Sequence, residues 1–161
     1  MNTRNGQART SALAAADATA AVPAGIVPYV SAGTLLILGD ESRALAAAEH
    51  CRQQENISCT VVITMPENGA GAVATRTLDG MTVMSATVAN LVGYLGAFQL
   101  TLGNPDGAAV IQAVTAGRQV FDLVLDLTRP ALINSQLLPP GYFAPGDDDA
   151  ALQQALDEIP E

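Results

Sequence analysis

Residues 34–65 read TLLILGDESRALAAAEHCRQQENISCTVVITM, and this stretch decides the fold class. The run from 34 to 38 is aliphatic and does not alternate with polar residues, which is typical of a strand buried on both faces of a parallel sheet. Gly39 turns the chain after this run. Residues 59–65 form a second run that is rich in β-branched side chains, so we predict a second strand there.

A helix is expected to connect these two strands. Asp40 or Ser42 can cap its start, and it should end near Gln54, with Leu45 and Ala48 recurring at helical spacing. A strand–helix–strand segment of this length forms a right-handed, parallel βαβ unit. The sequence therefore predicts a domain that opens on a Rossmann-like βαβ unit.

An antiparallel element is expected to follow. Residues 72–78 and 81–86 have the composition of short strands, and Asp79-Gly80 between them favours a tight hairpin turn. The predicted fold class is therefore α/β, with a mixed parallel and antiparallel sheet and flanking helices arranged as a two-layer or three-layer sandwich.

The second half of the chain is less regular. Residues 91–102 could form one strand with kinks at Gly93 and Gly96, and residues 104–107, Asn-Pro-Asp-Gly, form a turn. Residues 108–115 fit either a short helix or a strand.

A further strand is predicted over residues 120–127, with Asp126 near its carboxyl end. Residues 137–146 contain three prolines, so we expect an extended segment that lies over the body of the domain. Tyr142 and Phe143 are its expected anchors.

Three regions are expected along the chain. Residues 1–30 are Ala-rich and form a mobile leader, whereas residues 31–146 form the α/β domain. Residues 147–161 form an acidic helix, which is expected to lead into a downstream domain that this chain does not contain. The apolar stripe of this helix consists of Leu152, Leu156 and Ile159.

Composition restricts the function. The chain has 161 residues and a formal net charge of −9, and its seven Lys and Arg residues are scattered from Arg4 to Arg129. Binding to nucleic acid requires clustered basic residues, so it is not expected. No apolar run approaches the roughly 18 to 20 residues of a membrane span. Cys51 and Cys59 do not make a disulfide scaffold and favour a reducing compartment, so a cytoplasmic location is expected.

No complete catalytic or metal site is predicted. His50 is the single histidine and lies beside no G-x-S-x-G serine, so a nucleophile–histidine triad is not expected. His50 and Cys51 are neighbours on a helix and point in different directions, which disfavours a metal. Asp126 stands at a strand end, where it either contacts a ligand, caps a turn or pairs with Arg129; Asp122 lies four residues earlier on the same face.

The turn after the first strand is the candidate cofactor site. Gly39, Asp40, Glu41 and Ser42 occupy the place where a Rossmann fold binds pyrophosphate. A dinucleotide fingerprint needs three spaced glycines, whereas only Gly39 is present and Glu41 stands at the second place. The carboxylates of Asp40 and Glu41 also repel phosphate. Binding of NAD or FAD here is therefore an alternative and not the first interpretation.

Three segments carry a resemblance to a known family. They are GYLGAF at 93–98, FDLVLDL at 121–127 and PPGYFAPG at 139–146. With their flanking sequence, from about residue 29 to 161, they resemble the N-terminal region of bacterial multi-domain 4Fe–4S ferredoxin-like proteins of formate-dehydrogenase-associated clusters.

The resemblance implies a non-catalytic N-terminal scaffold or docking domain of an iron–sulfur electron-transfer protein, which is not an enzyme by itself. Its implied partner is a redox protein or a downstream ferredoxin domain. A 4Fe–4S cluster takes four thiolates, and Cys51 and Cys59 cannot supply them. No cluster ligand therefore carries over to this chain, and clusters are expected only in the downstream part of the parent protein. The alternatives are a nucleotide-binding oxidoreductase domain and a protein-interaction module with an exposed apolar segment around Tyr142 and Phe143.

Overall fold

The computed structural model describes residues 32–65, 74–103, 110–112 and 120–159, together with Gly6 and Arg9. The chain divides into two units, Met1–Val30 and Ser31–Glu161, and the elements below belong to the second. Apart from Gly6 and Arg9, the leader predicted over residues 1–30 lies outside the described residues. In chain order the elements are β1 (Thr34–Gly39), α2 (Glu41–Arg52), β2 (Ser58–Thr64), β3 (Ala74–Leu78), β4 (Met81–Val92), β5 (Gln99–Gly103), β6 (Val110–Gln112), β7 (Leu123–Asp126), β8 (Tyr142–Phe143) and α3 (Asp149–Glu158).

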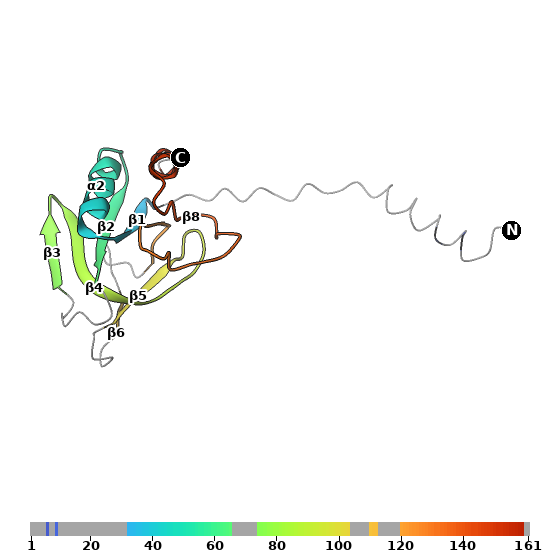
Figure 1. Ribbon diagram of the computed structural model, residues 1–161, viewed down its shortest axis with the longest axis horizontal. Coiled ribbons are helices and arrows are strands. Elements are labelled where there is room, and N and C mark those ends of the chain that lie inside the picture. The colour runs from blue at the N-terminus through green and yellow to red at the C-terminus, as the bar shows by residue number, and fades with distance from the viewer. Residues whose placement is uncertain are drawn as a thin grey trace. The chain divides into compact units, whose positions relative to one another are not determined.

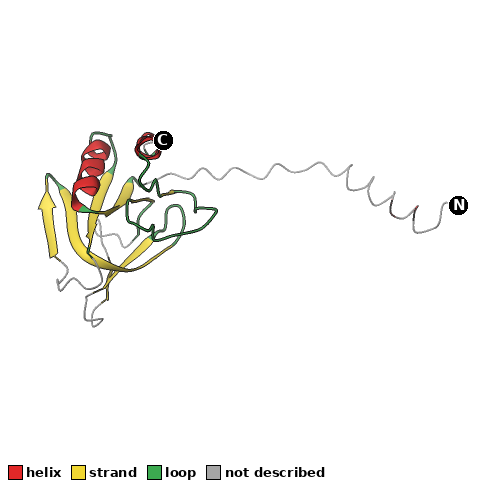
Figure 2. Ribbon diagram, in the orientation of Figure 1, coloured by secondary structure: helices red, strands yellow, loops and turns green. Residues whose placement is uncertain are grey.

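The strands form one mixed sheet, which confirms the predicted α/β class (Figure 1). Its order is β6-β5-β4-β2-β1-β7-β8, and β3 pairs with β4 outside this path. The central strands β4, β2, β1, β7 and β8 run parallel, whereas β3, β5 and β6 pair antiparallel with their neighbours. Figure 2 shows the strands together with the two helices α2 and α3.

The predicted strand–helix–strand start is confirmed. Every residue of β1 is buried, and β1 pairs in parallel with β2 from Thr34 opposite Ser58 to Gly39 opposite Ile63. Asp40 caps α2 and accepts a hydrogen bond from the Arg43 main-chain N. The buried face of α2 consists of the small side chains Ala44, Ala47, Ala48 and Cys51, which recur at helical spacing.

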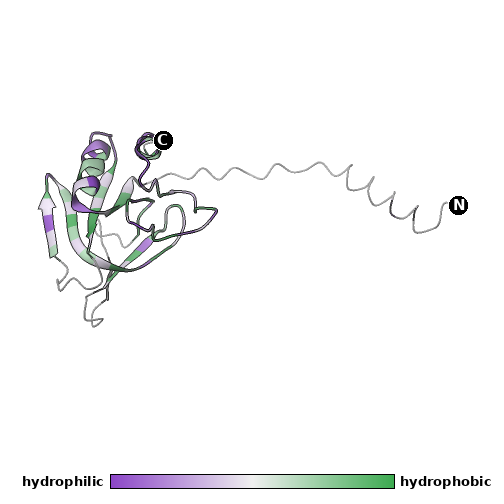
Figure 3. Cartoon of the chain, viewed as in Figure 1, coloured by the Kyte–Doolittle hydropathy of each residue, from purple (hydrophilic) through white to green (hydrophobic). Residues whose placement is uncertain are grey.

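The predicted hairpin is also confirmed. β3 pairs antiparallel with β4, from Ala74 opposite Ser85 to Leu78 opposite Met81. Asp79 and Gly80 between them both adopt positive φ, 49° and 84°, as a tight hairpin turn of this kind requires. All residues of β3 are exposed, and Figure 3 shows hydrophilic colour on this strand.

The single strand predicted over residues 91–102 is wrong. β4 ends at Val92 and β5 begins at Gln99, and the two strands pair antiparallel. Gly93 has a φ of 131°, and a Cβ at this position would lie 2.3 Å from the Ala97 main-chain oxygen. Gly93 and Gly96, which the sequence suggested were kinks within a strand, therefore belong to a chain reversal. The reversal leaves no room for a side chain at position 93.

Two further segments refine the predictions. Residues 110–112 form the strand β6, while the predicted turn at 104–107 lies outside the described residues. Within 120–127 only Leu123–Asp126 is regular strand, β7, which pairs in parallel with β1.

The sheet separates two hydrophobic cores, because successive strand residues point to opposite faces. The helix-side core contains buried residues of α2 and α3, and the other, which we call the β5-side core, contains residues of β5. The helix-side core comprises Leu35, Ile37, Ala44, Ala47, Ala48, Cys51, Cys59, Val61, Met81, Val83, Leu125, Leu127, Ala155, Leu156 and Ile159. The β5-side core comprises Leu36, Leu38, Val62, Met84, Ala86, Leu91, Phe98, Leu100, Leu102, Phe121, Val124 and Tyr142.

The C-terminal part packs against both cores. β8 pairs in parallel with β7, and the ring of Tyr142 lies 6.4 Å from that of Phe98, so Tyr142 anchors this segment as predicted. Asp148 caps α3 and accepts hydrogen bonds from two main-chain nitrogens of its first turn. Leu156 and Ile159 of the predicted stripe are buried in the helix-side core, and Leu152 packs against it.

Candidate functional site

A crevice lies at the carboxyl ends of the parallel strands. It consists of two hollows, of about 390 and 180 Å³, and both are lined by Thr64, Thr128 and Arg129. The larger hollow is also lined by Met65, Thr87, Val88, Pro130 and Leu132, and the smaller one by Asp40 and Leu127. We call the two hollows together the strand-end crevice.

The topology of the sheet accounts for the position of this crevice. After β1 the chain enters α2, which packs on the helix-side core. After β7 the chain passes to the opposite face, where Ile133 packs against the β5-side core. Neighbouring parallel strands whose connections leave in opposite directions create the opening in which α/β sheets hold ligands.

Asp126 fixes the loop that forms one wall of the crevice. Its side chain is fully buried, and its Oδ1 accepts hydrogen bonds from the main-chain N and hydroxyl of Thr128, at 2.8 and 2.6 Å. Its Oδ2 accepts from the Leu132 main-chain N at 2.7 Å and from the Tyr142 hydroxyl. Of the three roles that the sequence left open for Asp126, the structure assigns the turn cap, because all these contacts hold its own loop.

Burial is the main reason that the pKa of Tyr142 is raised, and the hydrogen bond to Asp126 adds to it. The Tyr142 hydroxyl also accepts a hydrogen bond from the Ile133 main-chain N at 3.0 Å. Tyr142 and Asp126 therefore act as a buried structural pair.

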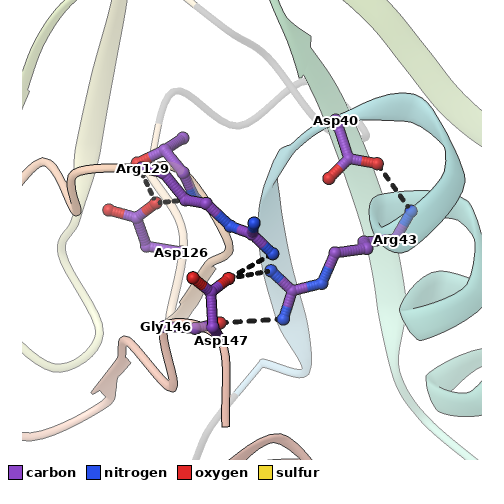
Figure 4. Close-up of polar contacts among 7 residues, drawn as sticks. Asp40, Arg43, Asp126, Arg129, Gly146 and Asp147 are labelled. Carbon is purple, nitrogen blue, oxygen red and sulfur yellow. Dashed lines mark hydrogen bonds and ion pairs between the residues drawn. The ribbon is translucent and has the colours of Figure 1, made fainter. Parts of the chain in front are cut away.

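Arg129 pairs with Asp147 and not with Asp126 (Figure 4). Arg43 of α2 approaches the same Asp147 oxygen, at 3.8 Å from its Nη1, and its Nη2 donates a hydrogen bond to the Gly146 carbonyl at 2.8 Å. Two guanidinium groups thus share one carboxylate beside the crevice. The Nη1 atom of Arg43 is buried and makes no hydrogen bond within the described part of the chain.

The structure divides the predicted cofactor residues. A Cβ on Gly39 would lie 2.9 Å from the Leu127 Cβ, so glycine permits close approach of the segment after β7. Asp40 lines the smaller hollow, where its carboxylate occupies the α2 N-terminus by capping Arg43 N at 3.0 Å. Glu41 is exposed and pairs with Arg76 of β3, and Ser42 is exposed, so neither lines the crevice.

Asp122 lies at the other end of the sheet from Asp126. Its Oδ2 accepts hydrogen bonds from the main-chain N and the hydroxyl of Thr34, both at 3.0 Å. The Asp122 main-chain N donates in turn to the Thr34 hydroxyl at 3.0 Å. This reciprocal pair joins the start of β1 to the segment before β7.

The two cysteines lie in the helix-side core as free thiols. Burial raises the pKa of Cys51 to about 11, and burial followed by the proximity of Cys51 raises that of Cys59 to about 12. Both are therefore protonated and inert at neutral pH. Among the described residues, His, Cys, Asp and Glu form no group of three or more that could hold a metal ion.

Of the described residues that line the crevice, sequence analysis placed only Asp40 in a candidate cofactor site, although part of the signal for the others was present. Thr64 lies near the end of one predicted strand and Thr128 directly follows another, and the carboxyl ends of parallel strands share one edge of the sheet. Thr87 could not be assigned to the crevice from sequence, because its strand was expected to end at residue 86, whereas β4 continues to Val92.

Comparisons with protein-family models, with curated proteins and with solved structures give no match. No helix in the described ranges is long and apolar enough to cross a membrane. The function is therefore inferred from the residues of the chain.

Proposed function

We propose that this chain is a non-catalytic scaffold and docking domain of a 4Fe–4S electron-transfer protein. The resemblance of residues 93–98, 121–127 and 139–146 to ferredoxin-like proteins suggests the kind of partner. The observation that carries the docking role is the apolar surface of two neighbouring loops.

The first loop joins β4 to β5, and the second joins β7 to β8. Tyr94 in the first is 68% exposed, and Leu137 in the second is 87% exposed. Leu138, also in the second loop, is 41% exposed. The loops approach each other closely, because a Cβ on Gly141 would lie 2.6 Å from the Leu95 Cδ1. Large apolar side chains exposed on adjacent loops are typical of a surface that binds another protein.

A groove continues this surface toward α3. It has a volume of about 180 Å³, and its lining includes Leu138 and Phe143 together with Ala151, Ala155 and Glu158 of α3. The sequence suggested an exposed apolar segment around Tyr142 and Phe143. Phe143 is half-buried and Tyr142 is buried, so of these two residues only Phe143 contributes to the exposed surface. A largely apolar lining that includes one carboxylate, Glu158, fits a partner that carries a basic residue beside an apolar contact.

In this proposal the cluster belongs to the partner or to another domain of the same protein. Cys51 and Cys59 are buried as neutral thiols on one core and cannot be presented to a cluster without opening that core. The domain would therefore position the cluster-bearing part and not bind the cluster itself. A reducing, cytoplasmic location is consistent with these free thiols.

The test is anaerobic purification of the full-length protein from its source cells, with iron and acid-labile sulfide measured per polypeptide. We expect both elements, together with the broad visible absorbance of an iron–sulfur cluster, on the same polypeptide or on a bound partner. A protein that carries neither iron nor sulfide in any anaerobic preparation would overturn the proposal.

A variant tests the docking surface within this experiment. Tyr94→Ser combined with Leu137→Ser should release a separate cluster-bearing partner, or slow electron transfer where the cluster is on the same polypeptide. Leu78→Ser is the matched control, because Leu78 is an exposed leucine on β3 outside the two loops. Equal iron content and equal electron-transfer rates in the double variant, the control and the wild type would remove the two loops from the interface.

A further inference from the structure

We propose that the strand-end crevice binds a small molecule that carries an oxyanion, a carboxylate or a phosphate, with Arg129 as its charged anchor. This site is separate from the two loops proposed for docking, and the proposal does not depend on the docking role.

The larger hollow has the size and lining of a small-molecule site. Its volume of about 390 Å³ lies within the range of roughly 300 to 1,000 Å³ that is usual for ligand pockets. Among the described lining residues, three threonines and Arg129 supply the polar part of the wall. The apolar part consists of Met65, Val88, Pro130 and Leu132. This combination fits a ligand with one charged end and a short apolar body.

Charge assigns the anionic end to the larger hollow. Arg129 is the one charged side chain among its described lining residues, whereas the smaller hollow also contains the carboxylate of Asp40. A guanidinium group binds carboxylates and phosphates through two parallel hydrogen bonds. Thr64 and Thr87 also line this hollow, and a threonine hydroxyl can donate to the same oxyanion.

The ion pair at Asp147 allows Arg129 to change partner. Asp147 is shared by Arg129 and Arg43, so it keeps one guanidinium when Arg129 turns to a ligand. The buried Nη1 of Arg43 lies 3.8 Å from Asp147 and makes no hydrogen bond within the described residues, and a small shift would give it one. Ligand binding therefore exchanges one charge pair for another and leaves no carboxylate unpaired.

The loop that carries Arg129 is fixed before a ligand arrives. Asp126 holds both Thr128 and Leu132 through main-chain hydrogen bonds, on either side of Arg129. The hydroxyl of Tyr142 in β8 donates a hydrogen bond to Asp126. A wall that is already ordered loses little conformational freedom on binding, which favours a specific site over a casual surface contact.

The site is distinct from a dinucleotide site at the start of α2. Asp40 already caps that helix, and its negative charge opposes a phosphate there. The crevice proposal instead places the anion beside Arg129, between the ends of β2 and β7. The two alternatives predict different residues in contact with ligand, and one experiment separates them.

The experiment is an NMR titration of the isotope-labelled full chain with inorganic phosphate, phenyl phosphate and butyrate, and separately with NAD and FAD. At least one of the three oxyanion probes should shift the amide signals of Thr64, Thr87 and Thr128 with saturation at millimolar concentrations. Binding of phosphate probes alone, or of butyrate alone, identifies which oxyanion the site takes.

Variants test the role of Arg129. Arg129→Gln should weaken binding by roughly tenfold or more, since a charged hydrogen-bonding partner is lost, and Arg129→Lys by less. Asp147→Asn should strengthen binding, because it frees Arg129. Arg52→Gln is the matched control, since Arg52 pairs with Glu49 in the last turn of α2 and does not line the crevice. Preserved signal dispersion shows that each variant is folded.

Three results would overturn the proposal. One is the absence of saturable shifts at these threonines with every oxyanion probe at tens of millimolar. The second is binding that Arg129→Gln leaves unchanged. The third is binding of NAD or FAD alone with shifts confined to Asp40, Glu41 and Ser42, which would favour the dinucleotide alternative.

Discussion

Phe98 and Phe121 exchange both of their main-chain hydrogen bonds across 23 positions of sequence, from Phe98 N to Phe121 O at 2.9 Å and from Phe121 N to Phe98 O at 2.8 Å. Both side chains are fully buried. This bridge joins the start of β5 to the segment that enters β7. In the sheet, β5 pairs with β4, and the order continues through β2 and β1 to β7. The bridge between Phe98 and Phe121 connects the two ends of this path, so these strands surround the β5-side core.

This closure makes Phe121 a sensitive position. Phe121→Ala should lower the free energy of unfolding by about 3–5 kcal/mol, because it leaves a cavity in the β5-side core. Phe121→Leu should cost less, about 1–2 kcal/mol, and remain folded. Urea unfolding followed by circular dichroism measures both. Tyr94→Ala is the control, since Tyr94 is mostly exposed and its loss should change stability by no more than about 0.5 kcal/mol. Equal effects of Phe121→Ala and Tyr94→Ala would contradict the burial of Phe121 in the β5-side core.

The reversal between β4 and β5 makes a second prediction. Gly93→Ala should destabilise the protein by at least about 1–3 kcal/mol, since it combines a positive φ with a Cβ placed 2.3 Å from the Ala97 oxygen. Gly103→Ala is the matched control, because its Cβ would make an ordinary 3.4 Å contact with Ala89. Thermal unfolding of the two variants side by side provides the measurement. A neutral Gly93→Ala would mean that the chain continues as the single strand expected from sequence.

The βαβ unit could be predicted because its signals are local. An aliphatic run, a capping Asp40 and helically spaced alanines each act within a few residues. The reversal at Gly93 could not be predicted from sequence, since the same apolar run fits either one kinked strand or two paired strands. The choice depends on the contact between Phe98 and Phe121, which no local pattern reveals.

Only part of the candidate site could be predicted from local sequence signals. Asp126 was correctly placed near a strand end, but its partners Leu132 and Tyr142 come from a loop whose path depends on tertiary packing. The pairing of Arg129 with Asp147 likewise depends on where α3 begins. The carboxyl ends of β2 and β7 could thus be located from sequence, whereas the end of β4 and the side-chain contacts around the opening could not.

The cysteines should be unreactive in the folded protein. Because burial raises the pKa of Cys51 to about 11 and of Cys59 to about 12, both stay protonated and inaccessible near pH 8. A chromogenic disulfide reagent should detect almost no thiol in the native chain and both thiols in denaturant. Ala46→Cys, at an exposed position of α2, should react at once and shows that the reagent is active. Rapid reaction of the wild-type thiols would contradict their burial and weaken the argument that they are not cluster ligands.

Tyr142→Phe removes a hydroxyl that serves Asp126 as donor and the Ile133 main-chain N as acceptor. At neutral pH it should cost about 1–3 kcal/mol, because two buried polar groups lose a partner. Burial and the bond to Asp126 raise the pKa of Tyr142 above its ordinary value of about 10. The neutral phenol therefore contributes stability that is fully present below about pH 10 and is lost as the pH rises through the folded-state pKa.

The pH dependence separates this pair from a simple packing effect. Urea unfolding at a series of alkaline pH values should show wild-type stability declining more steeply than that of Tyr142→Phe, so that the two curves converge. Tyr94→Phe should follow the wild type, since Tyr94 is exposed. A constant difference between wild type and Tyr142→Phe at every pH would mean that the phenol titrates alike in the folded and unfolded chain. Asp126 would then lack its hydroxyl partner, and the loop that carries Arg129 would be held by main-chain donors alone.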